Sequence, residues 1–319
     1  QRGRLACKGL PNGLPLQVGG QCYRFPSTFS ADFRCPICQS PLKVGEKVWQ
    51  CTGENPQQRQ HGFDVAKQGY VNLLPVQNKH SKNPGDSDES IMARRRFLQA
   101  GFYQSLQDGL YDFCKGLLSS QPSVNWLDIG CGEGYYTERF LQLNPSKLVA
   151  LDISKPAVLA TAKRLKQISM TTQQYCLVAS ASQVPLASQT VSMLTSIFSP
   201  ILADEFHRLV SDQGFVVIAK PAVNHLIEMR DGLFEQIVAH DSDKFIDELA
   251  PYFELVKQTR VETTISLTAM QLQDLLTMTP YAFRAQPARR EALIDRCQQA
   301  GSMRFTTDFM IYGFQKICL

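Results

Sequence analysis

Beyond residue 125 the apolar positions of the chain alternate between two patterns. Short, nearly continuous apolar runs predict buried strands, and they lie at residues 126–129, 148–151, 175–179, 191–198 and 215–219. Apolar residues at helical spacing predict helices between several of these strands, at residues 135–143, 155–167 and 203–211. Because strands that alternate with helices favour right-handed crossovers, the pattern predicts an α/β fold with a mostly parallel sheet covered on both faces.

The segments on either side of this region predict further helices and strands. Residues 91–118 have apolar positions at helical spacing, which predicts a helix or a pair of helices before the first strand. Residues 224–300 are mostly helical in pattern, but a β-branched stretch at residues 253–267 interrupts them. Residues 308–317 alternate between apolar and polar positions, as is typical of an edge strand.

The first ninety residues have a different character. Residues 1–32 show no clear periodicity and contain several Gly and Pro residues, so they predict a poorly ordered extension. Residues 33–76 contain a cluster of Cys and His residues, and the polar, turn-rich residues 77–90 predict a linker to a main domain at residues 91–319. A chain of 319 residues that is 44% hydrophobic can build one sizeable core and a smaller module.

Three glycines at alternate positions follow the first predicted strand, in the sequence LDIGCGEGYYT at residues 127–137. Gly130, Gly132 and Gly134 allow a tight turn against which a ligand can lie, and Asp128 precedes them. In an open parallel sheet this position, beyond the carboxyl ends of the strands, is where ligands bind. The spacing is G-x-G-x-G and not the G-x-G-x-x-G of dinucleotide sites, so it favours S-adenosylmethionine over NAD.

Two acidic residues support this choice of cofactor. Asp152 ends the second predicted strand, where a carboxylate can accept hydrogen bonds from both hydroxyls of a ribose. Glu133 inside the loop would repel a pyrophosphate but attract the ammonium of a methionine group. NAD stays an alternative, and so does a structural reading in which the glycines end a strand and Asp152 caps a helix. Ser180 and Ser182 follow the third predicted strand, where adenine lies in this fold.

Cysteine residues near the start of the chain predict a metal site. Cys35, Cys38, Cys51 and His61 offer three thiolates and an imidazole, which is a donor set that tetrahedral structural zinc prefers. The interval between Cys51 and His61 is long, so Cys22 and His80 are alternatives to His61. Free cysteines in a small apolar cluster are the other possibility, but so short a segment would hardly fold without a metal. Four protein ligands would make the zinc structural.

Basic and aromatic residues predict contacts with RNA. The net charge of +4 permits nucleic-acid binding without demanding it. Arg94, Arg95 and Arg96 can neutralise phosphates, although a solvated helix face paired with acidic residues explains them equally well. Further candidates are three aromatic side chains that can stack on bases, namely Phe198, Tyr281 and Phe283, together with the basic residue Arg284. Core packing is the alternative for Phe283.

The apolar runs and the cysteines of the sequence predict a cytoplasmic protein. Its apolar runs are shorter than the roughly 20 residues that a bilayer span needs, and residues 1–20 have no continuous apolar segment typical of a signal peptide. Its ten cysteines are spread through a large chain, which favours reduced thiols and a metal site over disulfides. We therefore expect neither a membrane nor DNA as a partner.

Several segments outside the glycine loop match one known family. They are CPIC from Cys35, HGFDVAKQGYVNLLPVQ from His61, PGDS from Pro84, ARR from Ala93 and MTPYAFRA from Met278. On these residues and the loop, the chain resembles the bacterial large-subunit ribosomal RNA guanine-N1 methyltransferases of the RlmA type. The resemblance implies an N-terminal zinc-binding module on a class I, Rossmann-like methyltransferase domain with a mostly parallel seven-stranded sheet. It also implies that the protein methylates a guanine in a hairpin loop of 23S ribosomal RNA, and that it forms a homodimer, as members of the family often do.

The resemblance also implies roles for individual residues. The zinc ligands would be Cys35, Cys38, Cys51 and His61, and the cofactor contacts would be Tyr103, Asp128, Gly130, Gly132, Glu133, Gly134, Asp152 and His225. Two features depart from the family pattern, namely the longer interval before His61 and residues 1–32, which have no counterpart. Candidates for the general base that removes the proton on guanine N1 are His225, Asp204 and Glu205, but a helix face explains the last two equally well and no base is assigned. The alternatives are a non-catalytic RNA- or ribosome-binding protein and a small-molecule methyltransferase.

Overall fold

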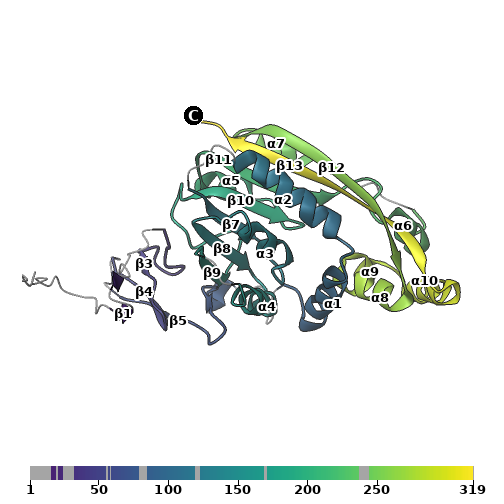
Figure 1. Cartoon of the computed structure of the whole chain (residues 1–319), viewed down its shortest axis with the longest axis horizontal. Coiled ribbons are helices and arrows are strands. Elements are labelled where there is room, and N and C mark those ends of the chain that lie inside the picture. Colours follow the sequence, from purple (N-terminus) through teal and green to yellow (C-terminus); the bar gives the residue numbers. More distant parts are fainter. Residues whose placement is uncertain are drawn as a thin grey trace, which may run out of the picture.

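The computed structural model contains an eight-stranded sheet with helices on both faces (Figure 1). It describes residues 32–54, 57, 59–78, 85–118, 123–168, 171–236 and 244–318, and the backbone of the short paired strands β1 (Leu16–Val18) and β2 (Gln21–Tyr23). Most of residues 1–32 lie outside this part of the chain, so their poor order stays a prediction. In the described part no helix is both long and apolar enough to cross a membrane.

Five parallel strands form the centre of the sheet, in the order β9-β8-β7-β10-β11. They are β7 (Asn125–Ile129), β8 (Lys147–Asp152), β9 (Gln173–Val178), β10 (Val191–Ile197) and β11 (Val210–Pro221). The helices between them are α3 (Tyr135–Leu141), α4 (Lys155–Leu165) and α5 (Ala203–Leu209). The predicted α/β fold is confirmed, and the carboxyl ends of the strands meet along one edge.

One end of the sheet is antiparallel and differs from the prediction. The long strand β13 (Met303–Lys316) pairs with β11 on one side and with β12 (Phe253–Leu267) on the other. The prediction of an edge strand at residues 308–317 is therefore wrong, because β12 occupies the edge. Many side chains of β12 are exposed, whereas most of β13 is buried.

The opposite end of the sheet has one strand more than the seven expected. β6 (Tyr70–Asn72) pairs in parallel with β9, so a strand from the predicted zinc-binding module at residues 33–76 belongs to the large sheet. The short 3-10 helix η1 (Val76–Asn78) follows it. The fold class stands, but its strand count is eight.

Helices before and after the parallel strands cover much of the sheet. The predicted helix pair is confirmed as α1 (Asp88–Gln99) and α2 (Gln104–Leu118), with Ser87 capping α1. The later helices are α6 (Ile227–Leu233), α7 (Lys244–Leu249), α8 (Ala269–Met278), α9 (Tyr281–Arg284) and α10 (Pro287–Ala300). Apolar residues of α1 to α4, α6, α8 and α10 form one core with the sheet, and those of α5 and α7 belong to a second core.

A small three-stranded sheet packs on the second core. Its strands are β3 (Leu42–Lys43), β4 (Val48–Cys51) and β5 (Gly62–Asp64), and they lie at the opposite end of the molecule from α8 and α10 (Figure 1). Phe33 and Trp49 contact the ring of Tyr175 on β9, with centroids 5.0 and 5.7 Å away. The small sheet is therefore attached to the large one by buried aromatic contacts.

Candidate functional site

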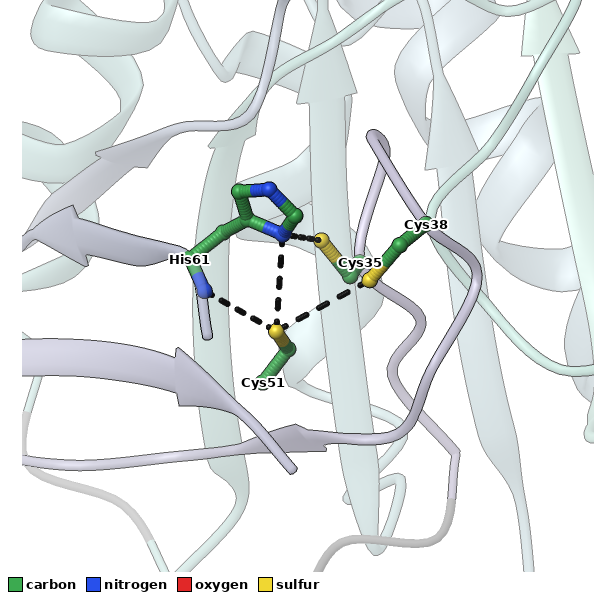
Figure 2. Close-up of side chains that lie close together, drawn as sticks. All are labelled: Cys35, Cys38, Cys51 and His61. Atoms are coloured by element: carbon green, nitrogen blue, oxygen red, sulfur yellow. Dashed lines mark hydrogen bonds between the residues drawn. The ribbon is translucent and has the colours of Figure 1, made fainter. Parts of the chain in front are cut away.

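The four predicted metal ligands meet at one point (Figure 2). Cys35 and Cys38 lie on a turn after Phe33, Cys51 ends β4, and His61 directly precedes β5. Cys38 Sγ lies 3.8 Å from Cys51 Sγ, and His61 Nδ1 lies 3.7 Å from Cys35 Sγ and 3.6 Å from Cys51 Sγ. All four ligand atoms lie within 4.8 Å of one another.

These separations suit a tetrahedral zinc ion. With bonds of about 2.3 Å to sulfur and about 2.0 Å to nitrogen, neighbouring ligand atoms lie roughly 3.5–3.8 Å apart. The long interval before His61 does not displace it, because the Cys51 N–H donates to the His61 carbonyl and the His61 N–H donates to Cys51 Sγ. The Cys22 side chain lies outside the described part of the chain, and so does the whole of His80. Four protein ligands leave no open position, so the donor set fits structural zinc.

The glycine loop connects β7 to α3. Gly130, Gly132 and Gly134 have φ values of +70°, +56° and +86°, the left-handed region that favours glycine. A Cβ atom at Gly130 would lie 2.6 Å from the Ser199 side chain, and one at Gly134 would lie 3.0 Å from Thr161 Oγ1. At Gly132 the nearest atom would be Arg94 Nη1, 3.6 Å away, so the loop has most room for a ligand here.

Asp152 joins the end of β8 to the glycine loop. Its Oδ2 accepts a hydrogen bond from the Gly132 N–H at 3.0 Å, and its Oδ1 accepts one from the Ser154 N–H at 2.8 Å. Burial raises the pKa of the carboxyl, and the two backbone donors act in the opposite direction. Because each carboxylate oxygen has a second lone pair, Asp152 can still accept ribose hydroxyls.

Asp128 lies beneath the loop and is fully buried. It accepts hydrogen bonds from the hydroxyls of Thr137 on α3, at 2.5 Å, and Thr195 on β10, at 2.8 Å. Burial raises the pKa of Asp128 to about 6. These bonds fix the loop between α3 and β10, and a direct contact of Asp128 with the cofactor stays a prediction.

Glu133 is buried although neither of its carboxylate oxygens has a hydrogen-bond partner. Arg164 Nη2 lies 3.5 Å from Glu133 Oε2, but the Arg164 guanidinium donates to Glu138 at 2.6 Å. Burial raises the pKa of Glu133, and the charges of Arg164 and Arg94 oppose this rise. A buried acceptor without a donor costs free energy, so a ligand ammonium at this position would be stabilised. This buried carboxylate, whose ion pair with Arg164 is long, fits S-adenosylmethionine.

Tyr103 on the α1–α2 connection and His225 meet in the buried site. Tyr103 Oη lies 3.4 Å from His225 Nε2, and the backbone N–H of Asp308 donates to His225 Nδ1 at 3.3 Å. Because Nδ1 accepts, neutral His225 carries its proton on Nε2 and donates it to Tyr103. The tyrosine hydroxyl is then free to donate to a ligand.

Two residues of this region were missed by sequence reasoning. Asp308 on β13 orients His225, as described above, and Tyr136 has a buried hydroxyl with no hydrogen-bond partner. Burial raises the pKa of Tyr136, and the neighbouring Tyr103 and Glu133 raise it further. Tyr136 was part of the loop motif, so its position in the sequence could have suggested it. Asp308 is distant in sequence and carried no such signal.

Phe198 follows β10 in a strained conformation. Its φ of +55° is unusual for a residue other than glycine, and its side chain is 44% exposed. The ring lies 5.5 Å from that of Phe309 and 6.4 Å from that of Tyr136. An exposed ring beside the site suits base stacking, and this contact stays a prediction.

The remaining candidates are distributed over several elements. Arg96 forms a two-pronged ion pair with Asp274 on α8, whereas Arg95 is exposed. Tyr281 is half-buried beside the ring of Phe234, Arg284 is exposed, and the Phe283 side chain is outside the described part. Ser180 and Ser182 lie beyond β9 and bond to each other at 2.8 Å. Their contacts with RNA or adenine stay predictions.

Comparison with known proteins defines the class of this chain. A family model for the RlmA N-terminal zinc ribbon matches residues 33–82, and a methyltransferase-domain model matches residues 127–214. Together with the parallel sheet and its glycine loop, these matches define a class I methyltransferase with an N-terminal zinc ribbon. Its methyl donor is S-adenosylmethionine.

Relatives define the family more narrowly. The 23S rRNA (guanine(748)-N(1))-methyltransferase of Streptomyces fradiae is 30% identical over 81% of this chain and 89% of its own length. A provisionally named 23S rRNA (guanine-N(1)-)-methyltransferase of Micromonospora griseorubida is 30% identical over 82% and 90%, and YxjB of Bacillus subtilis, provisionally named likewise, is 27% identical over 84% and 92%. The chain belongs to the family of 23S ribosomal RNA guanine-N1 methyltransferases.

Proposed function

We propose that this protein transfers a methyl group from S-adenosylmethionine to N1 of a guanine in a hairpin loop of large-subunit ribosomal RNA. The single observation that carries the proposal is the 30% identity over most of the chain to the Streptomyces fradiae methyltransferase. The site geometry supports it, because the loop at Gly132 lies beside the Asp152 carboxylate for ribose and carries a second, buried carboxylate at Glu133.

The proposed arrangement assigns one part of the cofactor to each group of residues. Asp152 accepts the ribose hydroxyls, Ser180 and Ser182 border the adenine, and Glu133 receives the ammonium. S-adenosylmethionine supplies an electrophilic methyl group when bound. Since methyl transfer is an in-line displacement, the protein mainly has to align guanine N1 and exclude water. Phe198 supports this by stacking on the target base.

Guanine N1 carries a proton that must leave, and Asp204, Glu205 and His225 are the candidates that could accept it. Asp204 accepts a hydrogen bond from the Tyr252 hydroxyl, and Glu205 pairs with Arg208 and accepts from the Val184 N–H. Both carboxylates therefore have structural partners on α5. His225 uses Nδ1 as an acceptor and directs its proton to Tyr103. No catalytic base is assigned among them.

A transfer assay tests the proposal. Purified protein, tritiated S-adenosylmethionine and unmethylated ribosomal RNA should give labelled RNA, and primer extension should stop at one new guanine because N1 methylation blocks its Watson–Crick edge. RNA that is bound but not labelled would favour a ribosome-binding protein. Labelled free metabolites with unlabelled RNA would favour a small-molecule methyltransferase.

The proposal includes the location and assembly of the protein. Ribosomal RNA as the substrate supports a cytoplasmic location and requires neither a DNA nor a membrane partner. The family resemblance supports a homodimer, in which the two copies would present their RNA-binding surfaces together. Light scattering at micromolar concentration tests this assembly, and a mass equal to one chain would contradict it.

A further inference from the structure

Arg94 on α1 faces the glycine loop and not the solvent-exposed side of the helix. Its Nη1 lies 3.6 Å from the position of a Cβ atom at Gly132, which has the most space among the three glycines of the loop. Only 24% of its side chain is exposed. Its guanidinium is therefore placed against the open part of the loop, where a bound ligand would contact it.

The Arg94 guanidinium is held in place but retains unused donors. Nη1 donates to Asp86 Oδ2 at 2.5 Å, and Nη2 donates to the Met278 carbonyl at 3.4 Å. The Asp86 carbonyl in turn accepts from the Ser154 hydroxyl, next to the β8 end that carries Asp152. Because a guanidinium has five N–H groups, these two bonds leave donors for a further acceptor.

The positive charge of Arg94 acts on several buried groups of the site. It opposes the raised pKa values that burial produces in Tyr103, Glu133, Tyr136 and Asp152. Arg94 is thus close to the groups that surround the loop. Glu133 follows Gly132 in the same loop, and its buried carboxylate has Arg164 3.5 Å away as an ion-pair partner.

We propose that Arg94 and Glu133 form a binding subsite for an α-amino acid zwitterion, in which Arg94 binds the carboxylate of the methionine group and Glu133 binds its ammonium. The inference rests on the proposed cofactor and extends it. A guanidinium matches a carboxylate by two parallel N–H···O bonds, and these bonds are strong where solvent is largely excluded. The cation and anion at the loop are complementary to the two charges of the ligand.

The competing role for Arg94 is a contact with an RNA phosphate. With 24% of its side chain exposed, Arg94 reaches outward less than an arginine on the surface that contacts an RNA phosphate would. Arg95 on the same helix is exposed and is better placed for RNA, while Arg96 is paired with Asp274. Arg94 therefore belongs to the cofactor site, although the three arginines are consecutive in the sequence.

Ligands that lack one group at a time test the subsite without RNA. Calorimetric titration of the wild-type protein would use S-adenosylmethionine, its decarboxylated form, which lacks only the carboxylate, and 5′-methylthioadenosine, which lacks the amino acid. We expect the carboxylate to improve affinity on the order of 10- to 100-fold, as for hydrogen bonds to charged groups. Equal affinity for the first two ligands would overturn the inference, whether or not any variant folds.

Two variants then separate the two charges. Arg94→Gln should weaken S-adenosylmethionine on the order of 10- to 100-fold and leave the decarboxylated ligand and 5′-methylthioadenosine unchanged. Glu133→Gln should weaken both ligands that carry an ammonium and leave 5′-methylthioadenosine unchanged. Arg304→Gln, which removes an exposed arginine of β13, is the matched control and should bind all three like the wild type.

The results also distinguish this inference from the proposed function. Equal weakening of all three ligands by Arg94→Gln would give Arg94 a structural role and overturn the subsite. Unchanged cofactor affinity with weaker RNA binding would overturn it in favour of a phosphate contact. A wild-type protein that binds none of the ligands would contradict the proposed cofactor itself. Retained carboxylate selectivity with unlabelled RNA would support the subsite and contradict only the proposed acceptor.

Discussion

Asp128 makes stability depend on pH. It is fully buried, and burial raises its pKa from 3.8 to about 6, so the folded protein holds this proton more tightly than the unfolded chain. Its contribution to stability is complete below about pH 4 and is lost as pH rises through about 6. Relative to Asp128→Asn, the unfolding free energy of the wild type should fall on the order of 1–3 kcal/mol over this range. Urea denaturation measures it, and parallel pH curves for both proteins would contradict it.

Gly130 combines a left-handed backbone with a close approach. Gly130→Ala would place Cβ 2.6 Å from the Ser199 side chain at a φ of +70°. Gly101 has a similar φ of +84° but no atom within 4 Å of a Cβ, so Gly101→Ala isolates the backbone penalty of about 1–2 kcal/mol. Gly130→Ala should cost more than this and weaken S-adenosylmethionine binding. Thermal denaturation and calorimetric titration check both effects, and equal costs would mean that Ser199 moves aside.

The zinc ribbon should depend on its metal while the large sheet does not. β3, β4 and β5 have two, four and three residues, which is too little for an independent core. Elemental analysis of freshly purified protein should give one zinc per chain. After chelation, amide exchange should accelerate in β3 to β5 but not in β7 and β8. Absence of zinc in the fresh protein, or equal acceleration throughout, would contradict this expectation.

The elements that sequence could predict are those whose local pattern matches their surroundings. The parallel strands are continuous apolar runs because both faces are covered, and β7 and β8 were placed within one or two residues. β6 was missed because three residues give no period. Alternation predicts an edge strand at residues 308–317 because it shows which faces a strand presents and not which strands pair with it.

The same distinction applies to the site. Spacing and topology predict the site residues that are close in sequence, such as Cys35 and Cys38, and those that end a strand, such as Asp152. The orientation of Arg94 towards the loop and the contact of Asp308 with His225 depend on how α1 and β13 pack against the sheet. No local pattern encodes such packing, so these contacts required the structure.

At the scale of the whole molecule, the ribbon is attached to the face of the sheet that carries α5 and α7. Phe33 pairs with Leu186 by a backbone bridge, and Asp32 forms an ion pair with Lys147 at the start of β8. The glycine loop leads into α3, which packs with α1 and α2 in the first core on the other face of the sheet. The attachment of the ribbon and the binding of the cofactor are therefore separable.

Trp49→Ala tests this separation. Trp49 lies 4.7 Å from the Phe33 ring and 5.7 Å from the Tyr175 ring, and its removal should loosen the ribbon by about 3–5 kcal/mol without altering the zinc ligands. If the ribbon positions RNA, the KM for ribosomal RNA should rise several-fold while the Kd for S-adenosylmethionine stays constant. Val48→Ala, which trims an exposed neighbour, is the control and should change neither. An unchanged KM for RNA would show that a fixed ribbon is not needed, and weaker cofactor binding would show that the two cores are coupled.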